Sequence, residues 1–250
     1  MNLAINSLSN RRPNFPYTTP GLGDRTHAML CAYQYSKKHN VPVTIHITSD
    51  KCDKDHKFES WNQLQQMIPN VNVMVWPVKE LSEKDWRNYL REKGFESETY
   101  FYSDTPEFLP LQGNKGIDFA KYFKELPCLE PVDCSSSFAT IPEKFATFQF
   151  DSTDDMRGAE GQKLINLRQK YESEGYKLIT IGGKSKHKKL RESLQHIGYL
   201  ISKADIHIGA DSGMFHLAQL YKPWNKIHLL KGSFLSHHAH RAIINGVTVI

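Results

Sequence analysis

Positions 204–220 read ADIHIGADSGMFHLAQL, an apolar alternation that runs into small polar residues and then into a helical pattern. Ile206 and Ile208 alternate as they would in a buried strand, and Ser212 is a residue type that favours the N-cap of a helix. The first turn of a helix leaves N–H groups free for an anion, and Gly213 lets a phosphate approach the backbone closely. The segment therefore predicts a strand, a tight turn and a helix whose start holds a phosphate group.

The same alternation of strands and helices runs through both halves of the chain. In the second half we expect strands at 145–150, 177–181, 226–230 and 247–250, and helices at 162–173 and 194–202. In the first half we expect strands at 3–5, 41–48, 71–76 and 100–102, and helices at 25–35, 61–68 and 82–93. This order predicts two doubly wound α/β domains, residues 1–140 and 141–250, joined within the stretch 104–142 that is rich in Pro, Gly and aromatic residues.

Positive charge is concentrated in the second half. Residues 1–145 contain 17 Lys and Arg against 18 Asp and Glu, whereas residues 146–250 contain 15 against 9. Such an excess of cations suits a domain that binds phosphate, in a nucleotide or in a polyanion, and an idle basic surface would explain the count equally well.

Length and composition are those of an ordinary globular protein. The 250 residues, 39% of them hydrophobic, are enough to bury a core. No apolar run is long enough to span a bilayer and residues 1–15 lack a signal pattern, so we expect a cytoplasmic protein. The cysteines show no paired spacing and are expected to be reduced: Cys31, Cys52, Cys128 and Cys134.

A second glycine turn precedes a helical pattern in the first half. Gly21 and Gly23 permit a sharp bend, and Asp24 falls at the start of the helix that follows. Taken alone, Asp24 is explained as a helix N-cap, which contributes about 1 kcal/mol and no chemistry.

Together these two segments resemble the bacterial heptosyltransferases, glycosyltransferases of the ADP-heptose:lipopolysaccharide type. The resemblance rests on the Gly-Leu-Gly-Asp turn at 21–24 and on the motif AD-x-x-IG-x-DSG-x-x-HLA at 204–218. The strand and glycine pair at 179–183 resemble the segment that precedes this motif in the family. The chain looks like a shortened form, with the loss in the first domain, where such enzymes read their acceptor.

The resemblance implies two Rossmann-like domains that face each other across a cleft, the GT-B arrangement, with no metal and no cofactor beyond the nucleotide-diphosphate sugar itself. Asp24 would be the general base that deprotonates the acceptor hydroxyl. The loop residues beside it, on the acceptor side, would be Gly21, Gly23 and Arg25. The residues that bind the donor would be Ser152, Arg157, Gly182, Gly183, Lys184, Lys186, Asp211, Ser212, Gly213 and His216.

The acceptor stays open at this point. A saccharide, a lipopolysaccharide core and a hydroxyl on a modified base of DNA all fit, the last because of the basic second half. The alternative from another class is a nucleotide-sugar or polyanion binding module without catalysis.

Plainer readings accompany the proposed sites. Asp211 to Gly213 could be an ordinary capped helix start, and His216 could satisfy a neighbouring backbone group. His237, His238 and His240 lack the spacing and the partners of a zinc site, and we expect a loop there.

Overall fold

The structure is a computed structural model that describes residues 2–6, 22–48, 57–76, 88, 92, 97–100, 107–110, 117–118, 125–150, 161–182, 193–232, 235 and 237–250. The chain divides into two compact units, Met1–Phe123 and Lys124–Ile250, and each is described by itself. The boundary predicted between residues 140 and 141 stays a prediction. Residues 125–140, which precede that predicted boundary, belong to the second unit. The Leu129 N–H holds them there by donating to the Leu220 carbonyl at 2.7 Å.

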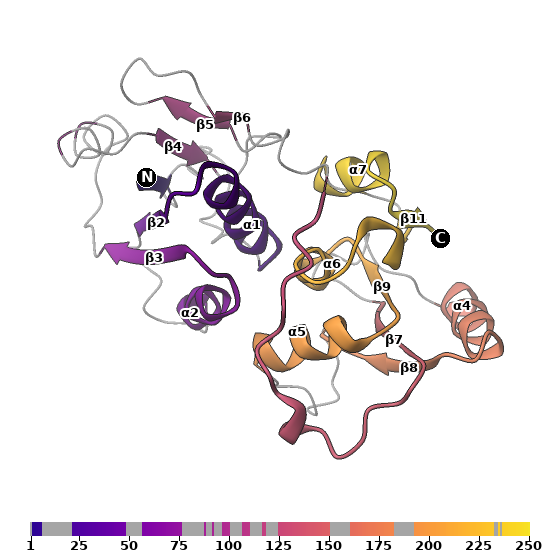
Figure 1. The fold of residues 1–250 in the computed structure, drawn as a ribbon. Helices are drawn as coiled ribbons and strands as arrows, with labels where there is room; N and C mark the ends of the chain where they lie inside the picture. Colours follow the sequence, from indigo (N-terminus) through magenta and orange to yellow (C-terminus); the bar gives the residue numbers. More distant parts are fainter. Residues whose placement is uncertain are drawn as a thin grey trace. The chain divides into compact units, whose positions relative to one another are not determined.

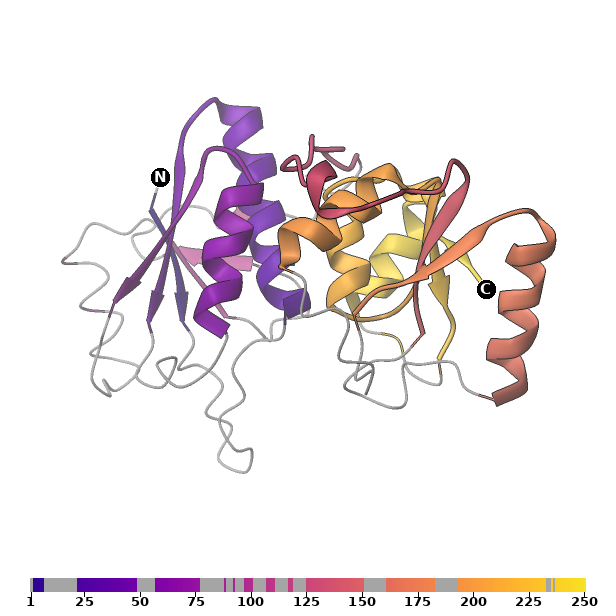
Figure 2. The ribbon, with the colours of Figure 1, turned by 90° about the horizontal axis from the view of Figure 1, so that it is seen from below.

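The first unit is built on a sheet with strand order β3-β2-β1-β4-β5-β6. Strands β1 to β4 are parallel, and β5 and β6 extend the sheet through antiparallel pairings. Their bounds are β1 Asn2–Asn6, β2 Val43–Thr48, β3 Val71–Trp76, β4 Ser97–Tyr100, β5 Glu107–Pro110 and β6 Ile117–Asp118. Helices α1 (Leu22–His39) and α2 (Lys57–Met67) cover one face, and Figure 2 shows both on the same side of the strands.

The core of the first unit lies between these helices and β2. Met29 and Cys31 of α1 and Leu64 of α2 are fully buried, as are Val43 and Ile45 of β2. The two β2 residues alternate along the strand, which is the pattern that predicted it. Strands β5 and β6 were not predicted.

The second unit contains a sheet of parallel strands with the order β11-β10-β9-β7-β8. Figure 1 labels β11, β9, β7 and β8 of this sheet. Its strands are β7 Phe145–Gln149, β8 Lys177–Thr180, β9 Ile206–Ala210, β10 Ile227–Leu230 and β11 Thr248–Val249. Its helices are α4 Gly161–Ser173, α5 Leu194–Lys203, α6 Gly213–Ala218 and α7 His237–Ile244. Figure 2 shows α4 on one face of this sheet and α5 and α6 on the other, so the unit is doubly wound as predicted.

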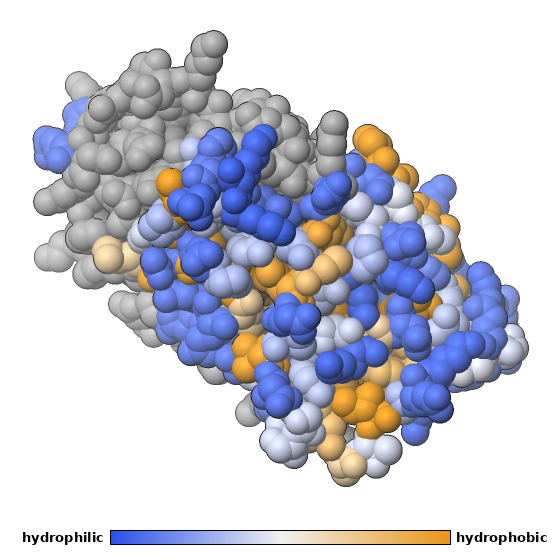
Figure 3. All heavy atoms as spheres, in the orientation of Figure 1, coloured by the Kyte–Doolittle hydropathy of each residue, from blue (hydrophilic) through white to orange (hydrophobic). Residues whose placement is uncertain are grey.

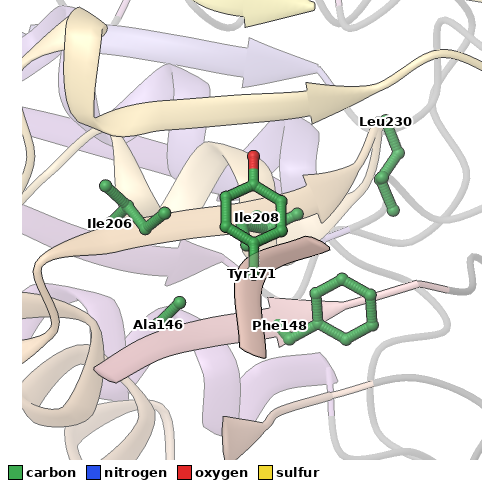
Figure 4. Close-up of a cluster of buried hydrophobic side chains, with 6 residues drawn as sticks. All are labelled: Ala146, Phe148, Tyr171, Ile206, Ile208 and Leu230. Atoms are coloured by element: carbon green, nitrogen blue, oxygen red, sulfur yellow. The ribbon is translucent and has the colours of Figure 1, made fainter. Parts of the chain in front are cut away.

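An apolar cluster joins α4 to its face of the sheet. Ala146 and Phe148 of β7 lie beside Ile206 and Ile208 of β9, and Tyr171 of α4 packs on them (Figure 4). Because side chains alternate along a strand, Thr147 and His207, which lie between these strand residues, face α5 and α6 instead. Both are polar, and the same face of the strands leads to the candidate site.

Two local predictions were wrong. The histidines at 237–240 lie in helix α7 rather than in a loop, because Ala239 and Ala242 are buried one turn apart and anchor a helical face. The helix predicted to continue through Leu220 ends at Ala218, and the turns that follow it lead into Pro223, which cannot continue a helix.

Three further observations concern the cysteines, the helix lengths and the surface of the described residues. Cys31, Cys128 and Cys134 are free thiols. Within the described part of the chain, no helix has the length and apolar character to cross a membrane. On the face drawn in Figure 3, apolar patches are small and separated by hydrophilic side chains.

Candidate functional site

The carboxyl edge of the second sheet has a topological switch point. From β7 the chain passes to β8 on one side and then returns to place β9 on the other side of β7. Loops that leave neighbouring strands in opposite directions open a crevice, and ligands of open α/β sheets bind there. The segment Asp211–Gly213 directly follows β9, so the predicted donor motif lies at this switch point.

Ser212 is the N-cap residue of α6, but its hydroxyl does not cap the helix. The backbone of Ser212 is extended, with φ −152° and ψ −177°. Its hydroxyl instead donates to Oε1 of Gln149, the last residue of β7, at 2.5 Å. This hydrogen bond therefore connects the ends of the two strands that form the switch point.

His216 and Asp211 form a buried pair beside it. Asp211 is fully buried, and its Oδ1 lies 3.8 Å from Nε2 of His216. Nδ1 of His216 is 3.3 Å from the amide nitrogen of Gln219, which can only donate. In the neutral ring the proton is therefore on Nε2, facing the carboxylate. These contacts connect His216 to the side chains of Asp211 and Gln219, and its role in donor binding stays a prediction.

Gly182, just beyond the end of β8 at Thr180, lies against the first turn of α6. It has φ +63°, and a Cβ atom placed on it would come within 2.7 Å of Cγ of Met214. The Met214 side chain therefore reaches the end of β8, and only glycine fits opposite it in this conformation. The predicted donor residues Gly182, Ser212, Gly213 and His216 are thus brought together at one edge of the sheet.

Below this edge, the polar face of β7 and β9 is buried. Thr147 and His207 are adjacent in register and their side chains are 3.0 Å apart, from Oγ1 to Nδ1. Burial lowers the pKa of His207 to about 3, with His228 and Lys222 as further positive neighbours, so the ring is neutral. Among the described residues its Nε2 has no hydrogen-bond partner, and it lies 2.5 Å from where Gly209 would carry a Cβ.

The first unit has its own switch point, between β1 and β4. The chain leaves β1 on the way to α1, which begins at Leu22, so Gly23 and Asp24 lie in the first turn of that helix. The Asp24 side chain is outside the described residues. Arg25 is buried and donates from Nη1 to Oγ of Ser60 in α2, so in this structure it packs between the two helices.

The remaining predicted site residues lie outside the described part of the chain. They are Gly21, Ser152, Arg157, Gly183, Lys184 and Lys186. Among the described residues, no group of three or more His, Cys, Asp or Glu side chains could hold a metal ion. The roles given to all these residues stay predictions.

Sequence reasoning missed two residues of this edge, Gln149 and Met214. Gln149 is a polar residue near the end of an otherwise apolar predicted strand, and it is only 3% exposed. A polar residue at the carboxyl end of a buried strand is a usable signal, because that is where parallel sheets bind ligands.

Comparison with solved structures shows the fold. The chain matches the E. coli ADP-heptose lipopolysaccharide heptosyltransferase II with TM-score 0.55 and 12% identity, over 100% of this chain and 90% of that one. It matches a family 9 glycosyl transferase from Veillonella parvula DSM 2008 with TM-score 0.53 and 11% identity, over 100% and 85%.

A third match is TibC, an iron-containing dodecameric glycosyltransferase of enterotoxigenic E. coli H10407, with TM-score 0.50 and 14% identity. The match includes 92% of this chain but only 57% of TibC. No family model matches the sequence, and no curated protein sequence matches it. The fold is therefore that of the heptosyltransferases, with two Rossmann-like α/β units, as predicted.

Proposed function

We propose that this chain is a glycosyltransferase that moves a sugar from a nucleotide-diphosphate sugar to an acceptor hydroxyl. One observation carries the proposal: the segment Asp211–Gly213 follows β9 at the switch point of its sheet, the place where this class of sheet binds ligands. The likeness in fold to heptosyltransferases supports the same reaction class.

The donor half of the reaction needs stabilisation of charge. When the sugar leaves, negative charge develops on the β-phosphate, and fixed N–H dipoles stabilise it without having to reorganise. The first turn of α6 provides such groups from Gly213 onward, since the first N–H groups of a helix have no partner within it.

The acceptor half needs a base. We assign this role to Asp24, which lies in the first turn of α1, the helix that follows β1 in the chain. A carboxylate there would take the proton of the hydroxyl as it attacks the sugar. The two units would then contribute one function each, in the GT-B manner.

We propose a saccharide as acceptor, because solved proteins of this fold include a lipopolysaccharide heptosyltransferase. A hydroxyl on a modified DNA base is the competing acceptor, suggested by the cations of residues 146–250. We also propose that transfer needs no metal. Chelation with EDTA should then leave the rate unchanged, and a loss restored by a divalent cation or by iron would contradict this part.

A thermal-shift screen of nucleotide sugars tests the donor. A ligand at 100 times its Kd should stabilise the protein by about 2.7 kcal/mol. The stabilising sugar is then offered with saccharide acceptors or with duplex DNA that contains hydroxylated bases, and transfer is measured. If no nucleotide sugar stabilises the protein, the proposal fails; if one stabilises it but no acceptor is modified, the chain is a binding module instead.

Two variants separate a base from a structural role at position 24, the third residue of α1. Asp24→Asn and Asp24→Ser both remove the base, and both also remove the negative charge that stabilises the first turn of a helix by about 0.3–1 kcal/mol. We expect both to bind the donor and to lose turnover by about 10²- to 10⁴-fold. If Asp24→Ser retains full turnover, Asp24 is a structural residue only.

A further inference from the structure

The face of the second sheet that α5 and α6 cover is unusual in being polar along its two central strands. Thr147 and Gln149 of β7 and His207 of β9 are all at most 3% exposed, and on the same side of β9's path, beyond Gly209, lies the fully buried Asp211. Burying polar groups is unfavourable unless they are hydrogen-bonded, so an apolar face would be the default here. The polar row ends at the switch point, in the hydrogen bond between Ser212 and Gln149.

We propose that Gln149 is a positioning residue of the nucleotide-sugar site, acting through Ser212. The proposal rests on the proposed function. Gln149 is not part of any motif that suggested the site, and it is separated from Ser212 by 63 positions. It pairs in register with Gly209, so its side chain starts beside the strand end from which the Asp211–Gly213 turn departs.

The direction of the hydrogen bond defines what Gln149 does. A serine at an N-cap ordinarily accepts from the N–H of the second or third helical residue and so closes the helix start. Here the Ser212 hydroxyl is turned to Gln149, and no capping hydrogen bond from its side chain exists. Gln149 therefore fixes the rotamer of Ser212 and, through it, the extended backbone that places the turn beside the end of β7.

A second contact holds the Asp211–Gly213 turn to the same edge of the sheet. Met214, two residues after Ser212, is held against Gly182 at the end of β8. The turn is thus attached to β7 by a hydrogen bond and to β8 by packing. Removal of Gln149 leaves the packing in place, so its loss should alter the geometry of the turn without unfolding the unit.

A double-mutant cycle on nucleotide binding tests this assignment. The probes are ADP, GDP, UDP and CDP, followed by the free nucleoside of the one that binds most tightly, measured by calorimetry. Gln149→Met has nearly the same shape but no acceptor, and Ser212→Ala removes the donor. Each should weaken the diphosphate by about five- to tenfold, the loss typical of one hydrogen bond, while the nucleoside changes little.

The double variant should bind no more weakly than the weaker single variant, because both changes break the same interaction. Ser212→Thr, which keeps the hydroxyl, should restore most of the affinity. Gln162→Met is the matched control, since Gln162 is exposed on α4 and its amide nitrogen donates to Oδ1 of Asn166, one turn further along the same helix.

Losses that add in the double variant would overturn the proposal, because the two side chains would then act independently. Equal losses for diphosphate and nucleoside would also overturn it, because Gln149 would then be a general structural residue. If the unmodified protein binds none of the four diphosphates, the proposed function fails and this inference with it, which distinguishes the two failures.

Discussion

Replacing Gly182 by alanine should be unusually costly for a glycine near a loop. The substitution has two separable effects. At φ +63° an L-residue lies in the left-handed region, which costs about 1–2 kcal/mol. In addition, the new methyl group would come within 2.7 Å of Cγ of Met214, and overpacking of this kind costs about 1–3 kcal/mol. The expected loss in the free energy of unfolding is therefore about 2–5 kcal/mol.

A second glycine separates these two effects. Gly175 also has positive φ, +86°, but a Cβ there would meet only the Lys144 side chain, at 3.5 Å or more. Gly175→Ala therefore reports the backbone cost alone. Combining Gly182→Ala with Met214→Ala should recover the overpacking part, so that the double variant is more stable than the sum of the two single changes predicts.

Urea denaturation of the four variants and the unmodified protein is the assay. If Gly182→Ala costs no more than Gly175→Ala, or if removal of the Met214 side chain recovers nothing, the contact between β8 and α6 is not as described. The placement of the donor motif against the end of β8 would then be wrong.

Three further predictions concern the second unit. The pKa of His207 is lowered to about 3, so between pH 6.5 and 3 the unfolded chain binds a proton that the folded chain does not. The free energy of unfolding should therefore fall as the pH falls through this window, by at most about 1.4 kcal/mol per pH unit from this group. His207→Gln should flatten this acid limb when the free energy of unfolding is plotted against pH. Nζ of Lys222 donates to the carbonyls of Ser202 and Ala204 at the end of α5. Lys222→Met should therefore lower the free energy of unfolding by about 1–3 kcal/mol, measured by thermal or urea denaturation. Burial lowers the pKa of Lys222 to about 8, so the advantage of the unmodified protein over Lys222→Met should grow from pH 8 to pH 10.5, and a constant difference would refute that shift. The ring of Phe138 stacks on Tyr199 with the centroids 5.8 Å apart. Phe138→Leu should therefore lower the free energy of unfolding by about 0.5–1.5 kcal/mol and speed proteolysis of residues 125–143. Unchanged cleavage would show that the stack does not anchor this segment.

Regular periodicity made most of the second unit predictable. Strands at 145–149, 177–180, 206–210 and 227–230 were expected within a residue or two, because buried parallel strands are short apolar runs bounded by turn residues. Strands β5 and β6 were not expected, since they are short and lie in a Pro- and Gly-rich stretch, where β5 pairs with β4 and β6 with β5. Helix α7 was missed because its apolar face consists of two alanines among histidines.

Local sequence pattern predicts the candidate site only where it is contiguous in sequence. Asp211, Ser212 and Gly213 could be recognised, because a strand, turn and helix start has a local pattern. Gly182 was predicted through the family resemblance instead. Gln149 and Met214 were missed, since Gln149 becomes adjacent to the turn only when β9 pairs with β7, and Met214 contacts Gly182 only in the folded sheet. Strand order is a tertiary property that local periodicity does not encode.

Hydrogen exchange with and without a saturating nucleotide sugar tests the central claim most directly, because it reports where the ligand binds. The account predicts slower exchange at the amides of residues 211–216 and at the end of β7, with α4 and β11 unaffected. Protection confined to other segments, with residues 211–216 exchanging at the same rate in both states, would contradict a donor site at the β7–β9 switch point.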